Sequence, residues 1–121
     1  MKTTWPTITQ ILKTDGVVII PTDTLYGVVG RAFSKKAVKR IYEIKGRDTG
    51  KPCIVLISSF DDLKKFGVRL DKEGQNFLRK FWPGKVSVIL PCKNNKYLYL
   101  HKGLESIAFR MISPKNKNLF N

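Results

Sequence analysis

Segments with helical spacing of apolar residues alternate along this chain with short runs of consecutive apolar residues. Helical spacing predicts four helices, over about residues 7–14, 35–45, 60–66 and 71–81. Consecutive apolar residues predict strands at 17–20, 53–57 and 86–90, with further strand candidates at 97–100 and 107–111. Residues 115–121 resemble the opening turn of another helix. Alternating helices and strands predict an α/β (α+β) fold.

Local signals set several of these boundaries. Ser34 is the expected N-cap of the helix over 35–45, and Gly46 is expected to end it. Pro21 closes the first strand. The β-branched run Val17–Ile20 and the run Cys53–Ile57 are continuous rather than alternating, which predicts strands buried on both faces.

The charge of the chain is its most unusual property. Its 121 residues include 23 Lys and Arg against 9 Asp and Glu, for a formal net charge of +14. Such a charge attracts nucleic acid, nucleotides or an acidic surface. The lysines are also scattered along the chain, which fits ordinary solvated faces equally well.

The amino-acid composition narrows the classes of protein that the sequence fits. Apolar residues make up 42% of the chain, enough for a core, and we expect a single domain over 1–121. Two isolated cysteines and one histidine favour neither a disulfide scaffold nor a zinc site. No apolar run is long enough to span a membrane, and residues 1–6 are not followed by the apolar core of a signal peptide. We therefore expect a cytoplasmic protein with reduced cysteines.

Polar groups follow the first predicted strand directly, in the segment PTDTLYGVVG that begins at Pro21. Ligands of open α/β sheets bind just beyond the carboxyl ends of the strands. Hydroxyl and carboxylate groups at Thr22, Asp23, Thr24 and Tyr26 are therefore candidate ligand contacts. An ordinary polar turn, with Asp23 as a helix or turn cap, explains the same residues.

A basic loop follows the helix over 35–45. Lys45, Arg47 and Lys51 lie within seven residues of a glycine-containing segment, and this arrangement suits phosphate or carboxylate groups. Favourable placement of cations at a helix C-terminus is the alternative.

Ser87 and Arg110 each lie inside a predicted strand. An arginine within the apolar run at 107–111 needs an anion, because burying it without a partner is prohibitive. That anion is either a ligand or an internal carboxylate such as Asp23.

Four motifs occur in this order: PTDTLYG, the helix end IKGR with KP shortly after, WPGKVSVIL, and IAFR. Together they resemble the YrdC-like threonylcarbamoyl-AMP synthase family. Its members typically show P-T-D/E-T-x-Y-G, then K-x-R with a following proline, then W-P-G-x-L/V-T, then A-V-R. The resemblance covers the chain from about residue 10 to 112.

The resemblance implies a fold and a reaction. The family fold is a twisted mixed α/β sheet with flanking helices around a positively charged cavity. Its enzymes condense L-threonine, bicarbonate and ATP, with Mg²⁺, into threonylcarbamoyl-AMP and pyrophosphate. The product serves N6-threonylcarbamoyladenosine modification of tRNA, so a tRNA threonylcarbamoyl-transfer complex is an implied partner.

The resemblance also implies site residues. Thr24, Tyr26 and Arg110 would bind L-threonine. The ATP-binding residues would be Lys45, Arg47, Lys51 and Ser87. No catalytic nucleophile and no metal ligand are expected among the side chains, because the reaction needs positioning and charge neutralisation rather than covalent catalysis.

The sequence departs from the family at several positions, and two of these departures bear on the nucleotide site. Ser87 stands where the family usually has threonine, which keeps a hydroxyl. The usual S/T-x-S-A-N segment, which contributes to the nucleotide site, is absent. A natural short or split form, a degraded gene product, or a fragment would each explain this, and each predicts reduced activity of the chain by itself.

Two alternatives remain. A non-catalytic basic module that binds tRNA or double-stranded RNA would explain the charge. Against it, the aromatic residues are expected on helical core stripes rather than on an exposed stacking platform: Phe60, Phe66, Phe77, Phe81 and Trp82. Hydrogenase-maturation carbamoyltransferases share the motif set, but their acylphosphatase and zinc-finger segments are absent here.

Overall fold

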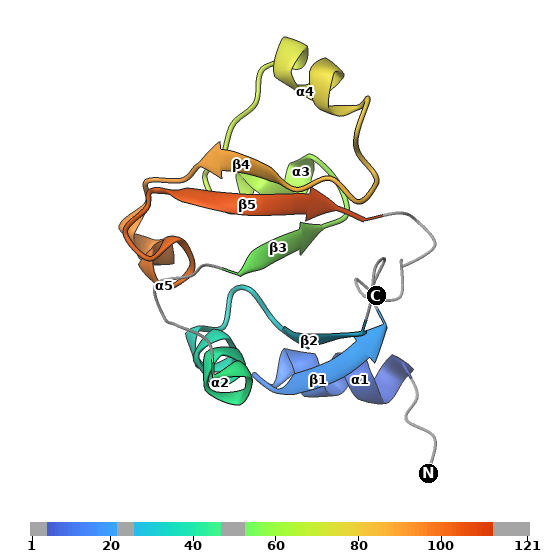
Figure 1. Ribbon diagram of the computed structural model, residues 1–121, viewed down its shortest axis with the longest axis vertical. Coiled ribbons are helices and arrows are strands. Elements are labelled where there is room, and N and C mark those ends of the chain that lie inside the picture. The colour runs from blue at the N-terminus through green and yellow to red at the C-terminus, as the bar shows by residue number, and fades with distance from the viewer. Residues whose placement is uncertain (1–4, 22–25, 47–52, 113–121) are drawn as a thin grey trace.

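The structure is a computed structural model, and it describes residues 5–21, 26–46 and 53–112. Its strands form two sheets (Figure 1). The first is an antiparallel hairpin of β1 (Val17–Pro21) and β2 (Tyr26–Gly30). The second has the order β3-β5-β4, with bounds Ile54–Ile57, Ser106–Met111 and Val88–Pro91. Its central strand β5 is parallel to β3 and antiparallel to β4, so the sheet is mixed.

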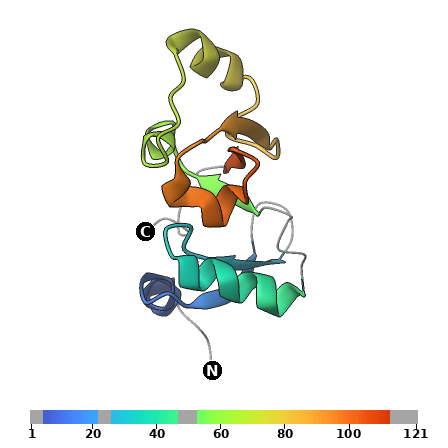
Figure 2. The ribbon, with the colours of Figure 1, turned by 90° about the vertical axis from the view of Figure 1, so that its left-hand side faces the viewer.

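Helices flank both sheets. They are α1 (Trp5–Lys13), α2 (Lys35–Lys45), α3 (Asp61–Lys64), α4 (Lys72–Leu78), the 3-10 helix η1 (Asn95–Tyr97) and α5 (Leu98–His101). The helices α1 and α2 pack against the hairpin, and α4 projects beyond the three-stranded sheet at the opposite end of the molecule (Figure 2). This arrangement confirms the predicted α/β class with a mixed sheet and flanking helices. No helix within the described ranges is long and apolar enough to cross a membrane.

The helix α2 forms as its sequence predicts. The Ser34 hydroxyl accepts a hydrogen bond from the Ala37 N–H at 3.0 Å, which satisfies one of the unpaired donors of the first turn. Gly46 ends the helix with φ at 59°, a left-handed conformation that glycine adopts without a steric cost. The predicted bounds of 35–45 are therefore confirmed.

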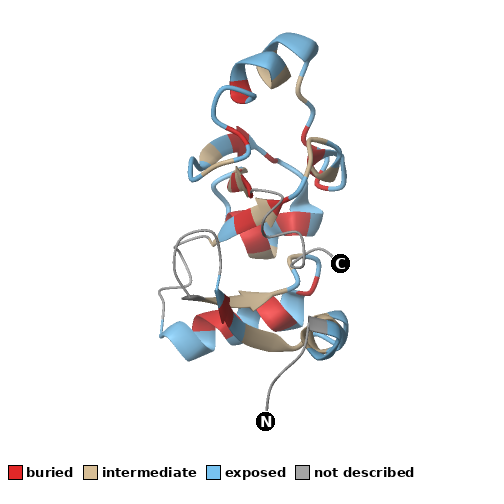
Figure 3. Cartoon of the chain, turned by 90° about the vertical axis from the view of Figure 1, so that its right-hand side faces the viewer, coloured by how far each residue is buried: buried red, intermediate tan, exposed pale blue. Residues whose placement is uncertain are grey.

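The core lies on one face of the three-stranded sheet. Side chains alternate along β5 between buried and half-buried, and Ile107, Phe109 and Met111 are the buried ones. Figure 3 colours each described residue of the chain by its burial. Ile54 of β3 and Ile89 of β4 lie on the other face and are 47% and 71% exposed. The prediction that strand 53–57 is buried on both faces is therefore wrong. It is also wrong for β1, where Ile19 is exposed.

Two further expectations are corrected. Residues 97–100 are helical rather than extended, because the Asn94 side chain caps η1 and Tyr97, Leu100 and His101 turn inward at helical spacing. The strand β2 lies in the segment around Gly27, where the sequence predicts a polar loop rather than a strand.

Aromatic side chains join the two sheets. The Tyr99 hydroxyl donates to the Ala32 carbonyl at 2.8 Å, just after β2. Phe33, in the same segment, stacks on Phe66 with ring centroids 4.7 Å apart. These contacts attach the hairpin and α2 to the three-stranded sheet, and so fix where the first sheet lies relative to the second.

Candidate functional site

The open face of the three-stranded sheet carries two predicted site residues side by side. Leu56 of β3 pairs with Arg110 of β5, and Val88 of β4 pairs with Phe109. Ser87 immediately precedes Val88, which places it beside Arg110 on the other side of β5. Leu56, Arg110 and Ser87 therefore form one row across the sheet, on the face opposite the core.

Hydrogen bonds fix the two polar members of this row. The Arg110 side chain donates from Nε and Nη2 to the Ser87 Oγ, at 3.2 and 3.0 Å. The hydroxyl thus accepts from one edge of the guanidinium and keeps its own proton to donate. Arg110 is half-buried, which weakens competition from water. A guanidinium oriented in this way on an open face suits a carboxylate or phosphate ligand.

The W-P-G segment holds Ser87 in place. Trp82 is 3% exposed, and its indole N–H donates to the Val86 carbonyl at 2.7 Å. The Gly84 N–H donates to the Met111 carbonyl at 2.9 Å, which ties the segment to β5 next to Arg110. A Cβ at Gly84 would lie 2.7 Å from the Phe81 carbonyl oxygen, so only glycine fits without movement. These contacts give a physical reason for Trp82 and Gly84 of the motif.

An apolar row borders the polar one. Ala108 of β5 pairs with Ile54 on one side and with Ile89 on the other. The three side chains lie on the same open face as Arg110, two residues along each strand. A ligand held by Arg110 would therefore have a nonpolar surface next to its charged end. The sequence missed this row because it depends on strand register.

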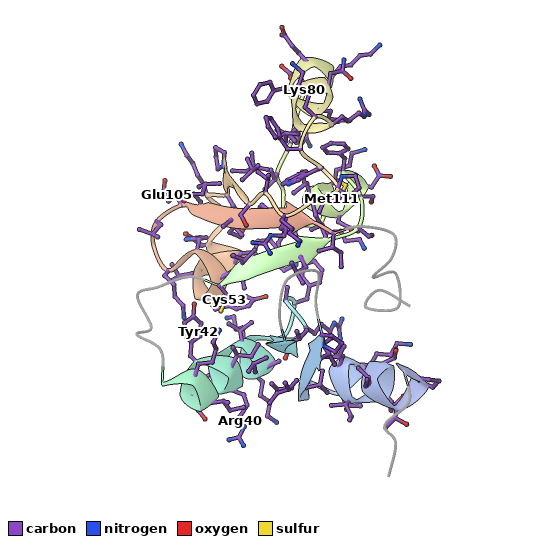
Figure 4. The ribbon with its side chains drawn as sticks, turned by 45° about the vertical axis from the view of Figure 1, so that its right-hand side comes forward. Arg40, Tyr42, Cys53, Lys80, Glu105 and Met111 are labelled. Carbon is purple, nitrogen blue, oxygen red and sulfur yellow. The ribbon has the colours of Figure 1, made fainter. Side chains whose placement is uncertain are left out.

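Of the other predicted site residues, the structure describes Lys45 and the backbone of Tyr26, which belong to other elements. Lys45 is exposed at the last residue of α2. Figure 4 shows Tyr42 of the same helix near Cys53, at the end of the sheet away from Met111. Tyr26 pairs through its backbone with Pro21 in the hairpin. Thr22, Asp23, Thr24, Arg47 and Lys51 lie outside the described residues, as does the segment 115–121.

An acidic side chain orders the turn after β3. The Asp62 carboxylate accepts from the Ser58 N–H at 2.8 Å, the Ser58 hydroxyl at 2.9 Å and the Ser59 N–H at 3.2 Å. Partial burial raises the pKa of Asp62, but these bonds and the nearby Lys65 ammonium outweigh it and hold the pKa below its ordinary value. Asp62 is therefore a structural anion at neutral pH.

Both cysteines are free. Burial raises the pKa of the Cys92 thiol, with a smaller opposing contribution from the Asn94 backbone N–H. Its weak hydrogen bond to the Phe66 carbonyl, at 3.5 Å, is consistent with a protonated core thiol. Within the described residues, no three His, Cys, Asp or Glu side chains come together to hold a metal ion.

Two of the predicted core aromatics are on the surface instead. Phe60 is half-buried, and Phe66 and Trp82 are buried as predicted. Phe77 and Phe81 are 58% and 42% exposed, with ring centroids 5.6 Å apart in an edge-to-face arrangement. The prediction of a core position is wrong for these two, because α4 projects from the sheet and buries Leu78 rather than its other face.

Comparison with known proteins agrees with this fold. The Sua5/YciO/YrdC family profile, described as "Telomere recombination", matches residues 10–118, so the chain belongs to this family. It is 36% identical over 115 residues to the threonylcarbamoyl-AMP synthase of Bacillus subtilis, covering 92% of this chain and 33% of that protein. It is also 36% identical over 95 residues to the Pyrococcus abyssi enzyme, covering 78% of this chain and 28% of that one. The chain thus spans about a third of the length of these relatives.

Solved structures resemble it as well. Pyrococcus abyssi Sua5 complexed with L-threonine superimposes with a TM-score of 0.80 at 30% identity, covering 95% of this chain and 35% of that one. Escherichia coli YciO superimposes with a TM-score of 0.76 at 22% identity, covering 98% of this chain and 60% of that one. The second likeness concerns the fold alone.

Proposed function

We propose that this chain carries the L-threonine-binding part of a threonylcarbamoyl-AMP synthase. The observation that carries the proposal is the Arg110–Ser87 pair on the open face of the sheet. Arg110 binds the carboxylate of L-threonine through N–H donors, and the Ser87 hydroxyl fixes the plane of the guanidinium. The row of Ile54, Ala108 and Ile89 offers a nonpolar surface to the threonine methyl group.

The remaining roles follow the family motifs. Thr24 and Tyr26, in the segment between β1 and β2, complete the threonine pocket. Lys45, Arg47 and Lys51 neutralise the phosphates of ATP. The same proposal keeps Ser87 near the nucleotide, so that one hydroxyl lies between the two substrates.

The reaction has two steps. The threonine amine attacks bicarbonate to form a carbamate, with loss of water. A carbamate oxygen then attacks the α-phosphorus of ATP, and the bond to the β-phosphate oxygen breaks to release pyrophosphate. Lysine and arginine side chains stabilise the charge that develops on the leaving group. Mg²⁺ is expected to bind together with ATP and would neutralise part of the charge on its phosphates.

Calorimetric titration with L-threonine tests the proposal. The Arg110→Gln variant removes the charge and should weaken binding about tenfold or more, because a charge-assisted hydrogen bond is worth roughly 1.5–3 kcal/mol. Arg40→Gln is the matched control, since Arg40 is an exposed arginine on α2, and it should change the affinity less than twofold. Equal losses in the two variants, or equal affinity for L-threonine and acetate, would contradict the proposal.

A non-catalytic RNA-binding role is the second candidate, favoured by one observation. Phe77 of α4 and Phe81, three residues beyond the end of that helix, are exposed, and the Lys80 ammonium lies 5.6 Å from the Phe77 ring centroid. Exposed rings beside cations suit stacked bases. RNA affinity that falls roughly 10³-fold between 50 and 200 mM salt would indicate contacts with about six or more phosphates. If a Phe77→Ser/Phe81→Ser variant kept that affinity, the exposed rings would no longer support an RNA-binding role.

A further inference from the structure

A hollow of about 430 Å³ lies between α2 and the segment that contains α5. The charged and tyrosine residues that line it are Lys35, Lys39, Lys102, Tyr42, Tyr99 and Glu43. We refer to this hollow as the lysine hollow. Tyr42 lies at the end of the sheet away from Met111, the neighbour of Arg110 (Figure 4). The lysine hollow is therefore separate from the Arg110–Ser87 pair.

The positive charge of the lysine hollow exceeds the negative charge of the one acidic residue that lines it. Three lysines line it, against the single carboxylate of Glu43. That carboxylate already lies 3.8 Å from the Arg40 guanidinium. Like charges that line one concavity repel each other, so an anion bound between them would lower the electrostatic energy.

The two tyrosines hold two of the ammonium groups. Lys102 Nζ lies 4.4 Å from the centroid of the Tyr42 ring, and Lys35 Nζ lies 5.7 Å from that of Tyr99. Such cation–π contacts favour defined positions for otherwise flexible side chains. A ligand entering the lysine hollow therefore meets positive charge rather than an open aromatic face.

The tyrosine rings are themselves fixed. Tyr42 is buried, and the Tyr99 hydroxyl is engaged with the Ala32 carbonyl. Burial raises the pKa of Tyr99, as does Tyr97, and Arg31 opposes this only in part. Tyr99 thus stays neutral and adds no negative charge to the lysine hollow.

We propose that the lysine hollow binds a small polyphosphate anion of di- or triphosphate size. Lys35 and Lys39 are four residues apart on α2, about 6 Å along its axis, which lets neighbouring phosphate groups each meet an ammonium. Lys102 approaches from the end of α5. A hollow of this volume suits a small ligand. A nucleobase is not part of the ligand, because ammonium groups already lie over the ring faces.

The bound anion would connect two parts of the molecule. The lysines come from α2, which packs on the hairpin, and from the end of α5, which packs on the three-stranded sheet. Binding should therefore raise the melting temperature as well as release heat, because a ligand that binds only the folded state stabilises it.

Calorimetry with sodium tripolyphosphate at 0.15 M salt tests the proposal, since distant charges are largely screened there. The Lys35→Gln/Lys39→Gln/Lys102→Gln variant should bind at least about tenfold more weakly, given the small contribution of each exposed ion pair. The matched control is Lys72→Gln/Lys80→Gln/Lys85→Gln around α4, which removes the same charge and should change the affinity less than twofold. Lys39→Gln alone, at an exposed position, should weaken binding about threefold and keeps the test available if the triple variant fails to fold.

Further measurements distinguish the lysine hollow from the proposed threonine site and from a nucleic-acid surface. Arg110→Gln, which alters the proposed threonine site, should keep tripolyphosphate binding, and adenosine should not bind in the lysine hollow. Absence of tripolyphosphate binding to the wild-type chain, or equal losses in the two triple variants, would overturn the proposal. So would a short RNA that binds more tightly than tripolyphosphate and depends on the same three lysines, because the surface would then belong to a nucleic acid.

Discussion

Arg110 and Ser87 are 23 residues apart in sequence, and two N–H groups of the arginine donate to the one serine hydroxyl. The antiparallel pairing of β4 with β5 brings them together, and the W-P-G segment fixes the start of β4 against the end of β5. The motif resemblance assigned the two residues to different substrates. Under the proposed function, their contact puts the Ser87 hydroxyl between the two substrates.

Ser87→Ala should weaken L-threonine binding about fivefold, because it removes the acceptor that orients Arg110, a loss of about 1 kcal/mol. Ser87→Thr retains the hydroxyl and should bind L-threonine within twofold of the wild-type chain. Calorimetric titration of both variants measures the difference. If Ser87→Ala binds as tightly as Ser87→Thr, the hydroxyl does not position the guanidinium.

Trp82→Phe should lower the free energy of unfolding by about 2 kcal/mol, through lost volume in the core and the lost hydrogen bond to the Val86 carbonyl. Chemical denaturation measures this change. Phe81→Leu, at the exposed neighbouring position, should stay within about 0.5 kcal/mol of the wild-type value. Comparable losses at the two positions would show that Trp82 is not the anchor of the segment.

Asp62→Asn should flatten the dependence of stability on acid pH. The pKa of Asp62 is lower in the folded chain than its ordinary value of 3.8. Its contribution is therefore complete above pH 3.8 and is lost as the pH falls through the folded-state pKa. Denaturation between pH 2 and 6 should show a shallower acid decline in the variant. A parallel decline in both proteins would mean that Asp62 is not stabilised by the Ser58 and Ser59 donors.

Arg47→Ala should weaken ATP binding by at least ~1.5 kcal/mol, about tenfold, if Arg47 meets a phosphate. Because the lysine hollow is proposed to bind phosphates as well, the comparison is made in the Lys35→Gln/Lys39→Gln/Lys102→Gln background. Unchanged ATP affinity in that background would mean that Arg47 is only a solvated cation near a helix end.

Part of this fold could be predicted because it depends on residues that are close together in the sequence. The Ser34 cap and the Gly46 stop act within a few residues, so the bounds of α2 follow from the sequence. The strand predicted at 97–100 is helical because Asn94, which caps η1, precedes the apolar run, and the run itself has the composition of a strand. The strand β2 was missed because its glycines and valines pair with β1 across a turn, which periodicity within one segment does not reveal.

The site was predictable to a smaller extent. The motifs identified Arg110 and Ser87 as polar residues within strands, which is unusual enough to indicate a role. Their contact depends on the register of β4 against β5, and so does the row of Ile54, Ala108 and Ile89. The exposure of Phe77 and Phe81 depends on how far α4 projects from the sheet. Such long-range properties leave no pattern within a single segment.

Pyrophosphate release tests the central claim most directly. The chain is assayed with L-threonine, bicarbonate, ATP and Mg²⁺, alone and fused to the C-terminal remainder of the catalytic domain of its Bacillus subtilis relative. We predict slow release from the chain alone and faster release from the fusion, dependent on L-threonine and bicarbonate and lost in Arg110→Gln. Full activity of the chain alone would contradict the expectation that the absent S/T-x-S-A-N segment is needed. A folded fusion without threonine-dependent release would contradict the proposed enzyme function itself.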